Sequence, residues 1–187
     1  MIHMVQNKSN LEFELLLILA RGRAHLREMA RMTGVPHSTV MRCLNRLVEE
    51  NVLDFKPQGR NKSFSIKKNL QAKNRLFMAE RYKLQKLLEK YPSLNVVLSD
   101  LLSSTDAPLV VLFGSYAKFA AKSDSDIDIY LGDVEDGKRK KAEVAYSGLS
   151  VKIGPFDMQS PLIKEIVKNH VILRGEEEFY DKAGFFA

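Results

Sequence analysis

The most constraining feature of this 187-residue chain is the stretch from Pro108 to Leu131. It opens on five consecutive apolar residues, 109–113, which are typical of a strand buried on both faces. A Gly-Ser pair breaks this run, and the later segment Ser125–Ile129 alternates between polar and apolar residues. Because strand side chains point to opposite faces in turn, we expect Asp126 and Asp128 to share one face of a second strand.

Two carboxylates at i and i+2 on one strand can bind the same hard cation, and Mg²⁺ prefers oxygen ligands of this kind. The Gly114-Ser115 turn offers backbone N–H groups and a hydroxyl that could hold a phosphate beside that cation. For an Asp-x-Asp pair taken alone, the alternative is an exposed strand face that carries two solvated aspartates.

Taken together, the apolar strand, the Gly114-Ser115 turn and the pair Asp126 and Asp128 resemble the motif of the DNA polymerase beta-like nucleotidyltransferases. The closest similarity is to their minimal branch, and it covers about residues 105–182. The resemblance implies that Asp126 and Asp128 bind Mg²⁺ or Mn²⁺ and that the substrate is a nucleoside triphosphate, with ATP favoured. The residues implied to contact the nucleotide are Gly114, Ser115, Lys118 and Ser125. Two metal ions would stabilise the attacking and leaving oxygens during transfer of the nucleoside monophosphate to a hydroxyl group.

The same family places a third catalytic carboxylate, also a metal ligand, on a later strand, and Asp157 is our candidate for it. We expect residues 156–158 to form a short strand with Asp157 between apolar neighbours, and the alternative is an aspartate that caps a turn beside Pro155. The sequence departs from the family at Lys118-Phe119, where the family often has Arg-Gly. Lysine lacks the bidentate fork of arginine, and we expect the loop after Ser115 to be shaped differently.

The N-terminal part has a different organisation. Apolar residues recur at helical spacing and predict three helices, at 10–21, 26–30 and 36–48, with Gly34 in the turn before the third. Two strand-like segments, 52–55 and 63–66, flank a turn rich in basic residues. This order resembles a winged helix-turn-helix domain over about residues 10–68.

In such domains the third helix enters the major groove of DNA and the wing contacts the backbone. The resemblance implies a DNA-binding set on the third helix, namely Ser38, Thr39, Arg42, Asn45 and Arg46. It implies phosphate contacts from three residues of the wing: Lys56, Arg60 and Lys62. Residues 1–70 carry a net charge of +6 and residues 105–187 a net charge of −3, which agrees with a polyanionic partner for the first part. The alternative is a winged helix that serves protein contacts alone.

The predicted fold class is α+β with two domains and helices between them. We expect a winged helix of three helices and a β-hairpin over residues 1–69, linker helices over 70–104, and a polymerase-beta-like α/β core with a mixed sheet over 105–187. The linker helices either pack on one domain or form a dimer seam. We favour a homodimer, because a two-fold dimer suits palindromic DNA.

Composition excludes several classes of protein. The single cysteine, Cys43, rules out an intrachain disulfide and an all-cysteine metal site. The longest apolar run, Leu15–Ala20, is too short to cross a bilayer, so we expect no membrane association and a cytoplasmic location.

Two functional hypotheses follow. The first is an Mg²⁺-dependent nucleotidyltransferase that modifies a protein or RNA and is tethered to a DNA-binding winged helix. Minimal members of the family resemble antitoxins that modify small helical HEPN toxins, so the resemblance implies a helical toxin-like partner. The alternative is a DNA-binding transcriptional regulator whose nucleotidyltransferase domain senses a nucleotide or a partner without turnover.

Overall fold

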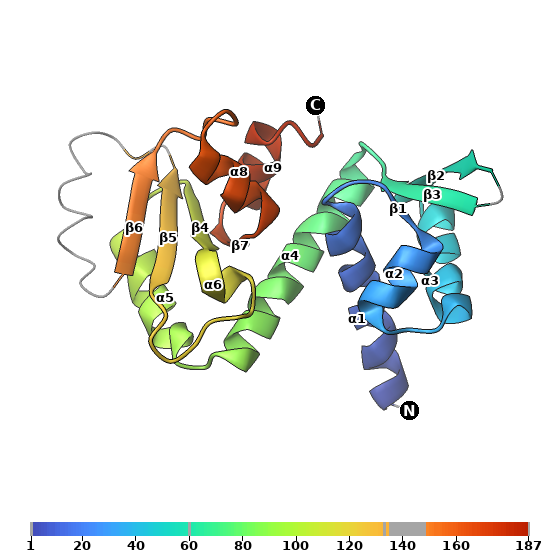
Figure 1. The fold of residues 1–187 in the computed structure, drawn as a ribbon, viewed down its shortest axis with the longest axis horizontal. Helices are drawn as coiled ribbons and strands as arrows, with labels where there is room; N and C mark the ends of the chain where they lie inside the picture. The colour runs from blue at the N-terminus through green and yellow to red at the C-terminus, as the bar shows by residue number, and fades with distance from the viewer. Residues whose placement is uncertain (1, 60, 133, 135–148, 187) are drawn as a thin grey trace. The chain divides into compact units, whose positions relative to one another are not determined.

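The computed structural model describes residues 2–59, 61–132, 134 and 149–186. The chain divides into two compact units, one reaching from the N-terminus to Tyr82 and including Phe186, the other extending from Lys83 to Phe185. The first unit is winged-helix-like and the second contains a mixed sheet, so the predicted α+β organisation is confirmed at this level (Figure 1).

Three helices form the core of the first unit: α1 (Ile2–Leu19), α2 (Leu26–Thr33) and α3 (His37–Glu49). Gly34 ends α2 with φ of 67°, a left-handed conformation that glycine adopts without steric cost. This residue makes the turn into α3, as predicted. Fully buried leucines of α1 and α3 pack together in one core: Leu15, Leu16, Leu44 and Leu47.

A small antiparallel sheet completes this unit, with the strand order β1-β3-β2. Its strands are β1 (Ala24–His25), β2 (Leu53–Gln58) and β3 (Asn61–Ile66). Phe55 pairs with Phe64, and Phe64 is fully buried in the core. The hairpin of β2 and β3 is the predicted wing.

Two further helices follow, α4 (Leu70–Lys90) and α5 (Leu94–Ser104). The boundary between the units falls inside α4. Ala72 and Ala79 are buried in the first core, whereas Leu87 is buried in the second core together with Leu98 of α5. The helices expected as a linker over 70–104 are therefore parts of the two cores, because their apolar faces are buried there.

The second unit is built on a four-stranded sheet with the order β6-β5-β4-β7. The strands are β4 (Leu109–Phe113), β5 (Ile127–Gly132), β6 (Leu149–Gly154) and β7 (Val171–Arg174). Only the β5–β6 pair is parallel, so the sheet is mixed.

Both faces of this sheet are covered within the unit. Leu112 of β4 and Ile129 of β5 pack in one core with α5. On the opposite face, the Tyr130 ring lies 6.2 Å from the Phe156 ring, which lies 5.5 Å from the ring of Phe179. Figure 1 shows α5 on one side of the sheet and the C-terminal helices on the other. In the described part of this unit, the helices that follow β4 are α6 (Gly114–Ala117), α8 (Pro161–Lys168) and α9 (Glu176–Lys182).

Arg174, the last residue of β7, ties the sheet to the end of α5. Its guanidinium group donates hydrogen bonds to the carbonyl oxygens of Leu102 at 2.6 Å, Thr105 at 2.7 Å and Ala107 at 3.2 Å. The last carbonyl oxygens of a helix have no hydrogen-bond partner within the helix. The Arg174 side chain supplies donors to several carbonyl oxygens at and just after the end of α5.

Among the described residues, no helix is long and apolar enough to cross a membrane.

Candidate functional site

One face of α3 is buried and the other carries polar side chains. Val40, Leu44 and Leu47 point into the core. Ser38, Arg42 and Asn45 are exposed and follow one another at helical spacing. These are three of the five residues predicted on this helix to contact DNA, and the geometry leaves them accessible.

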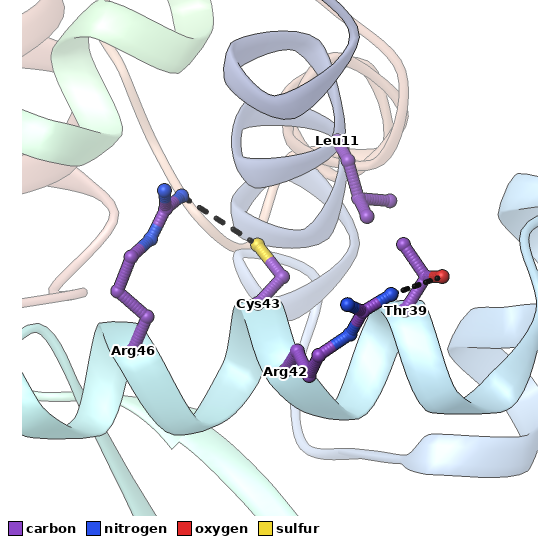
Figure 2. Close-up of a pocket in the computed structure, with 5 residues that line it drawn as sticks. All are labelled: Leu11, Thr39, Arg42, Cys43 and Arg46. Carbon is purple, nitrogen blue, oxygen red and sulfur yellow. Dashed lines mark hydrogen bonds between the residues drawn. The ribbon is translucent and has the colours of Figure 1, made fainter. Parts of the chain in front are cut away.

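The other two predicted residues of α3 lie toward α1. Thr39 is half-buried and accepts a hydrogen bond from Arg42 at 3.3 Å, as Figure 2 shows. Arg46 donates a hydrogen bond to Glu12 of α1 at 2.8 Å. Arg46 is therefore engaged within the protein, and its contact with DNA stays a prediction that this ion pair does not favour. No local pattern indicates the pairing, because Glu12 lies on a distant helix.

Glu12 is the centre of an ion-pair network between three helices. Its side chain is 7% exposed and accepts hydrogen bonds from Arg46 of α3 and, at 2.7 Å, from Arg75 of α4. Arg75 also pairs with Glu50 at 2.9 Å. Burial raises the pKa of Glu12, while the charges of Arg75 and Arg46 act in the opposite direction. The network holds the third helix against α1 and α4.

An open groove of about 590 Å³ lies beside the start of α3. It is lined by α2, α3 and the wing, through His25, Leu26, Arg27, Glu28, His37, Met41 and Lys62. Sequence reasoning did not assign His25 or Arg27 to a DNA surface. The apolar positions of α2 could have indicated Arg27, because Met29 and Ala30 are buried and leave Arg27 exposed on another face.

The predicted wing residues do not act as one set. Partners in register share a face of a sheet, so Lys62 lies on the face of Phe55 and Phe64, whereas Lys56 lies on the other face with Ser63. The Lys62 ammonium group lies 4.2 Å from the centre of the Phe55 ring. Lys62 lines the groove beside α3, and Lys56 does not. Arg60 lies outside the described residues.

In the second unit, the Gly-Ser turn and the second aspartate of the motif come together. Asp128 pairs with Phe113, so its side chain lies beside the turn that follows β4. Gly114 has φ of 69°, and a Cβ atom at this position would overlap the Asp128 carboxylate. A glycine is therefore required at this position, because any side chain would collide with the Asp128 carboxylate.

The remaining motif residues are less favourably placed for a nucleotide. Asp126 is exposed and precedes β5, so the strand begins later than expected. Ser115 is half-buried in α6, a short helix of four residues. The hydroxyl of Ser125 accepts a hydrogen bond from the Lys122 N–H at 2.8 Å and so closes the turn before β5.

Lys118 forms an ion pair with Glu165 of α8 at 2.7 Å. The hydrogen bond and the charge of Lys118 lower the pKa of Glu165. A phosphate would therefore compete with Glu165 for Lys118. The neighbouring Phe119 has φ of 56°, a conformation that favours glycine. The family often has glycine at this position. The backbone here has a conformation typical of glycine, although the residue is Phe119.

The structure does not bring Asp157 to the other two aspartates. Residues 156–158 form no strand, and the Asp157 carboxylate accepts a hydrogen bond from the Gln159 N–H at 2.9 Å. Asp157 follows the C-terminal end of β6, whereas Asp128 lies near the N-terminal end of the parallel strand β5. At ~3.3 Å per residue, opposite ends of these strands are well beyond the reach of a shared ion. The short strand expected over residues 156–158 is not formed, because Pro155 is followed by a turn. The role of Asp157 as the third metal ligand stays a prediction that this placement does not favour.

Among the described residues, no three side chains of His, Cys, Asp or Glu are grouped closely enough to hold a metal ion. The residue that pairs with Asp128 on β6 is Ser150, a neutral residue. Two aspartates with one neutral neighbour do not fit the three-carboxylate centre that the resemblance implies. We therefore derive no catalytic step through metal ions.

Residues 13–57 match the model of the IclR helix-turn-helix domain. The N-terminal unit carries an IclR-type DNA-binding helix-turn-helix. The matched segment contains α2, the turn at Gly34 and α3. The exposed stripe of Ser38, Arg42 and Asn45 therefore lies on the third helix of an IclR-type domain.

Among solved structures, the adhesin competence repressor of Streptococcus pyogenes is similar at 16% identity and a TM-score of 0.36. The similarity covers 51% of this chain and 76% of that one. The comparison with curated proteins gave no match.

Proposed function

We propose that the protein is a transcription regulator that binds DNA through α3 and whose C-terminal unit senses a nucleotide or a partner without turnover. The observation that carries this proposal is the accessible stripe on α3 beside a groove with basic lining, inside an IclR-type helix-turn-helix. Arginine and asparagine can each bond a base edge with two hydrogen bonds, and lysine bonds phosphate as a point charge.

The roles of the individual side chains follow from their positions. Arg42 and Asn45 face outward on α3 and would read base edges in the major groove. Lys62 and Arg27 line the same groove beside α3 and would contact phosphates of the DNA backbone there. Lys56 lies on the other face of the wing and contributes less.

The DNA-binding proposal is tested by selecting a preferred duplex from a random pool and measuring affinities at several salt concentrations. We expect Arg42→Gln to lose about 1–3 kcal/mol and to relax the preference at one base position. Lys62→Gln should weaken binding to all sequences and reduce the salt slope by about 1. Lys56→Gln is the matched control and should change affinity less than Lys62→Gln. A duplex preference that survives Arg42→Gln and Asn45→Ala unchanged would contradict the assignment of α3.

A second candidate function, nucleotidyl transfer, is favoured by one observation, the close approach of Gly114 to Asp128. Against it stand the position of Asp157 at the far end of the sheet and the ion pair that engages Lys118. The regulator is therefore the better supported function, with the C-terminal unit as its sensing part.

The two functions are separated by incubating the protein with α-labelled nucleoside triphosphates, Mg²⁺ and cell extract. We expect no label on protein or RNA beyond that seen with the Asp126→Asn/Asp128→Asn double variant. Unchanged DNA affinity of the double variant would show that its first unit is intact. Label that depends on Asp126 and Asp128 would instead establish nucleotidyl transfer and remove the sensing role proposed for this unit.

A further inference from the structure

His25 and His37 line the groove beside α3, and the proposed function gives neither of them a role. His25 is the last residue of β1 and the N-cap residue of α2, whereas His37 is the first residue of α3. The same groove is lined by Arg27 and Lys62, to which we assign phosphate contacts. All four residues belong to the first unit, so a DNA backbone that lies along the groove passes both histidines.

The ring of His25 is held in one orientation by the wing. Its Nδ1 atom lies 3.3 Å from the backbone carbonyl oxygen of Lys62 in β3. A carbonyl oxygen can only accept a hydrogen bond, so Nδ1 carries a hydrogen and donates it. In the neutral ring Nε2 is then an acceptor, and it becomes a donor only when the ring takes up a second proton. Among the described residues Nε2 has no hydrogen-bond partner, so this atom is available to a ligand in the groove.

The groove lining surrounds His25 with charged groups and with a second titratable ring. They come from α2, β3 and α3 and are, in that order, Arg27, Glu28, Lys62 and His37. Lys56 of β2 and His25 both pair with Ser63, so they lie two strand spacings apart, about 10 Å. His25 also lies at the N-terminus of α2, where the helix dipole is positive. Apart from Glu28, the charges around His25 disfavour a proton on its ring, and a DNA phosphate in the groove would favour it.

We propose that His25 is a further phosphate-binding residue of the DNA interface and that it binds only in its protonated form. In the neutral ring, the lone pair of Nε2 would face phosphate oxygens, which also only accept hydrogen bonds. In the charged ring, Nε2–H would donate a charge-assisted hydrogen bond to the phosphate while Nδ1 keeps its bond to Lys62. One proton is then taken up with the DNA. The affinity for DNA should therefore rise as the pH falls through the range in which histidine titrates, around pH 6.5.

His37 provides an internal comparison for this role. It is exposed at the start of α3 in the same groove, and among the described residues no hydrogen bond fixes its ring. A ring that is free to rotate loses more conformational freedom on binding than a ring that is already oriented. We therefore expect His25 to account for most of the pH dependence.

The test is the affinity of the full chain for a fluorescent DNA duplex of mixed sequence at pH 5.5 and pH 7.5, at constant low salt. Phosphate contacts do not depend on the base sequence, so any duplex reports on them. We expect the Kd of the unmodified chain to fall about tenfold toward pH 5.5, as one hydrogen bond to a charged group allows.

Two substitutions at the same position separate the proton from the shape of the ring. His25→Asn keeps a donor near the position of Nδ1 and removes Nε2, so its Kd should differ by less than about twofold between the two pH values. His25→Gln places a neutral N–H donor near the position of Nε2. It should bind at pH 7.5 at least as tightly as the unmodified chain and should also lose the pH dependence.

His37→Asn is the matched control and should retain most of the pH dependence. The inference rests on the proposed function, because it places DNA along the groove. Absence of DNA binding at both pH values would overturn the proposed function and this inference with it. DNA binding with the same Kd at both pH values, pH dependence that persists in His25→Asn, or its loss in His37→Asn would overturn the assignment of His25 alone.

Discussion

A Glu12→Leu variant is expected to lose about 2–4 kcal/mol of the free energy of unfolding of the first unit. The carboxylate accepts hydrogen bonds from Arg46 and Arg75 at 2.8 and 2.7 Å, and its side chain is 7% exposed. Removing it leaves two guanidinium groups without their buried acceptor. Both arginines retain partial access to water, with 41% and 31% of their side chains exposed, which keeps the loss below that of a fully buried pair.

A comparison of the single variant with a double variant shows whether the arginines left without Glu12 cause the loss of stability. In Glu12→Leu/Arg46→Leu, an apolar side chain replaces the arginine whose remaining carboxylate, Glu50, lies 3.8 Å away, so we expect about half of the lost stability to return. Glu49→Gln changes an exposed glutamate of α3 and should alter stability by less than about 0.5 kcal/mol. The free energy of unfolding of this unit is measured by urea unfolding that is monitored through hydrogen exchange of the amides in α1 and α3. A loss below 0.5 kcal/mol in Glu12→Leu would mean that the network does not stabilise the helices.

This network also marks a limit of sequence reasoning. The spacing of apolar residues predicted a helix over residues 36–48, and its apolar residues Val40, Leu44 and Leu47 are buried. The same spacing placed Arg46 on the surface that contacts DNA. Its acceptor Glu12 lies 34 residues away in the sequence, and no local pattern links the two. Periodicity predicts which face is buried, but the partner of a charged side chain depends on how distant helices pack.

The wing shows a second limit. A run of basic residues in a hairpin suggested one phosphate-binding set, but the faces of a hairpin depend on register. Pairing of Lys56 with Ser63 and of Pro57 with Lys62 puts the two lysines on opposite faces. A register shift by a single residue would exchange the faces on which the two lysines lie. The turn sequence alone did not determine the register, so it could not predict these faces.

In the C-terminal unit, the local part of the motif could be predicted and the distant part could not. Gly114 and Asp128 lie together because the antiparallel register of β4 and β5 pairs Phe113 with Asp128. The third carboxylate was inferred from apolar neighbours of Asp157, which are also found beside a turn. Phe156 packs against Tyr130 and Phe179, so these neighbours serve the core without forming a strand.

A Gly175→Ala variant is expected to lose about 3–4 kcal/mol of the free energy of unfolding of the second unit, from combined backbone and overpacking costs. Gly175 follows β7 and has φ of 87°, where an added Cβ would overlap the carbonyl oxygen of Pro108 just before β4. To avoid this overlap, the chain must move Arg174 and with it the three hydrogen bonds to the end of α5.

Gly184→Ala separates the two costs within the same unit. Gly184 also has a left-handed backbone, with φ of 67°, but nothing lies within 4 Å of an added Cβ. This variant should lose only the backbone cost of about 1–2 kcal/mol. Hydrogen exchange of β4 and β7 amides measures both losses, and the difference between the variants is the cost of the overlap with Pro108. Equal losses would mean that β7 can move away from β4 without breaking the contacts of Arg174, and that the close packing at Gly175 does not hold the sheet to α5.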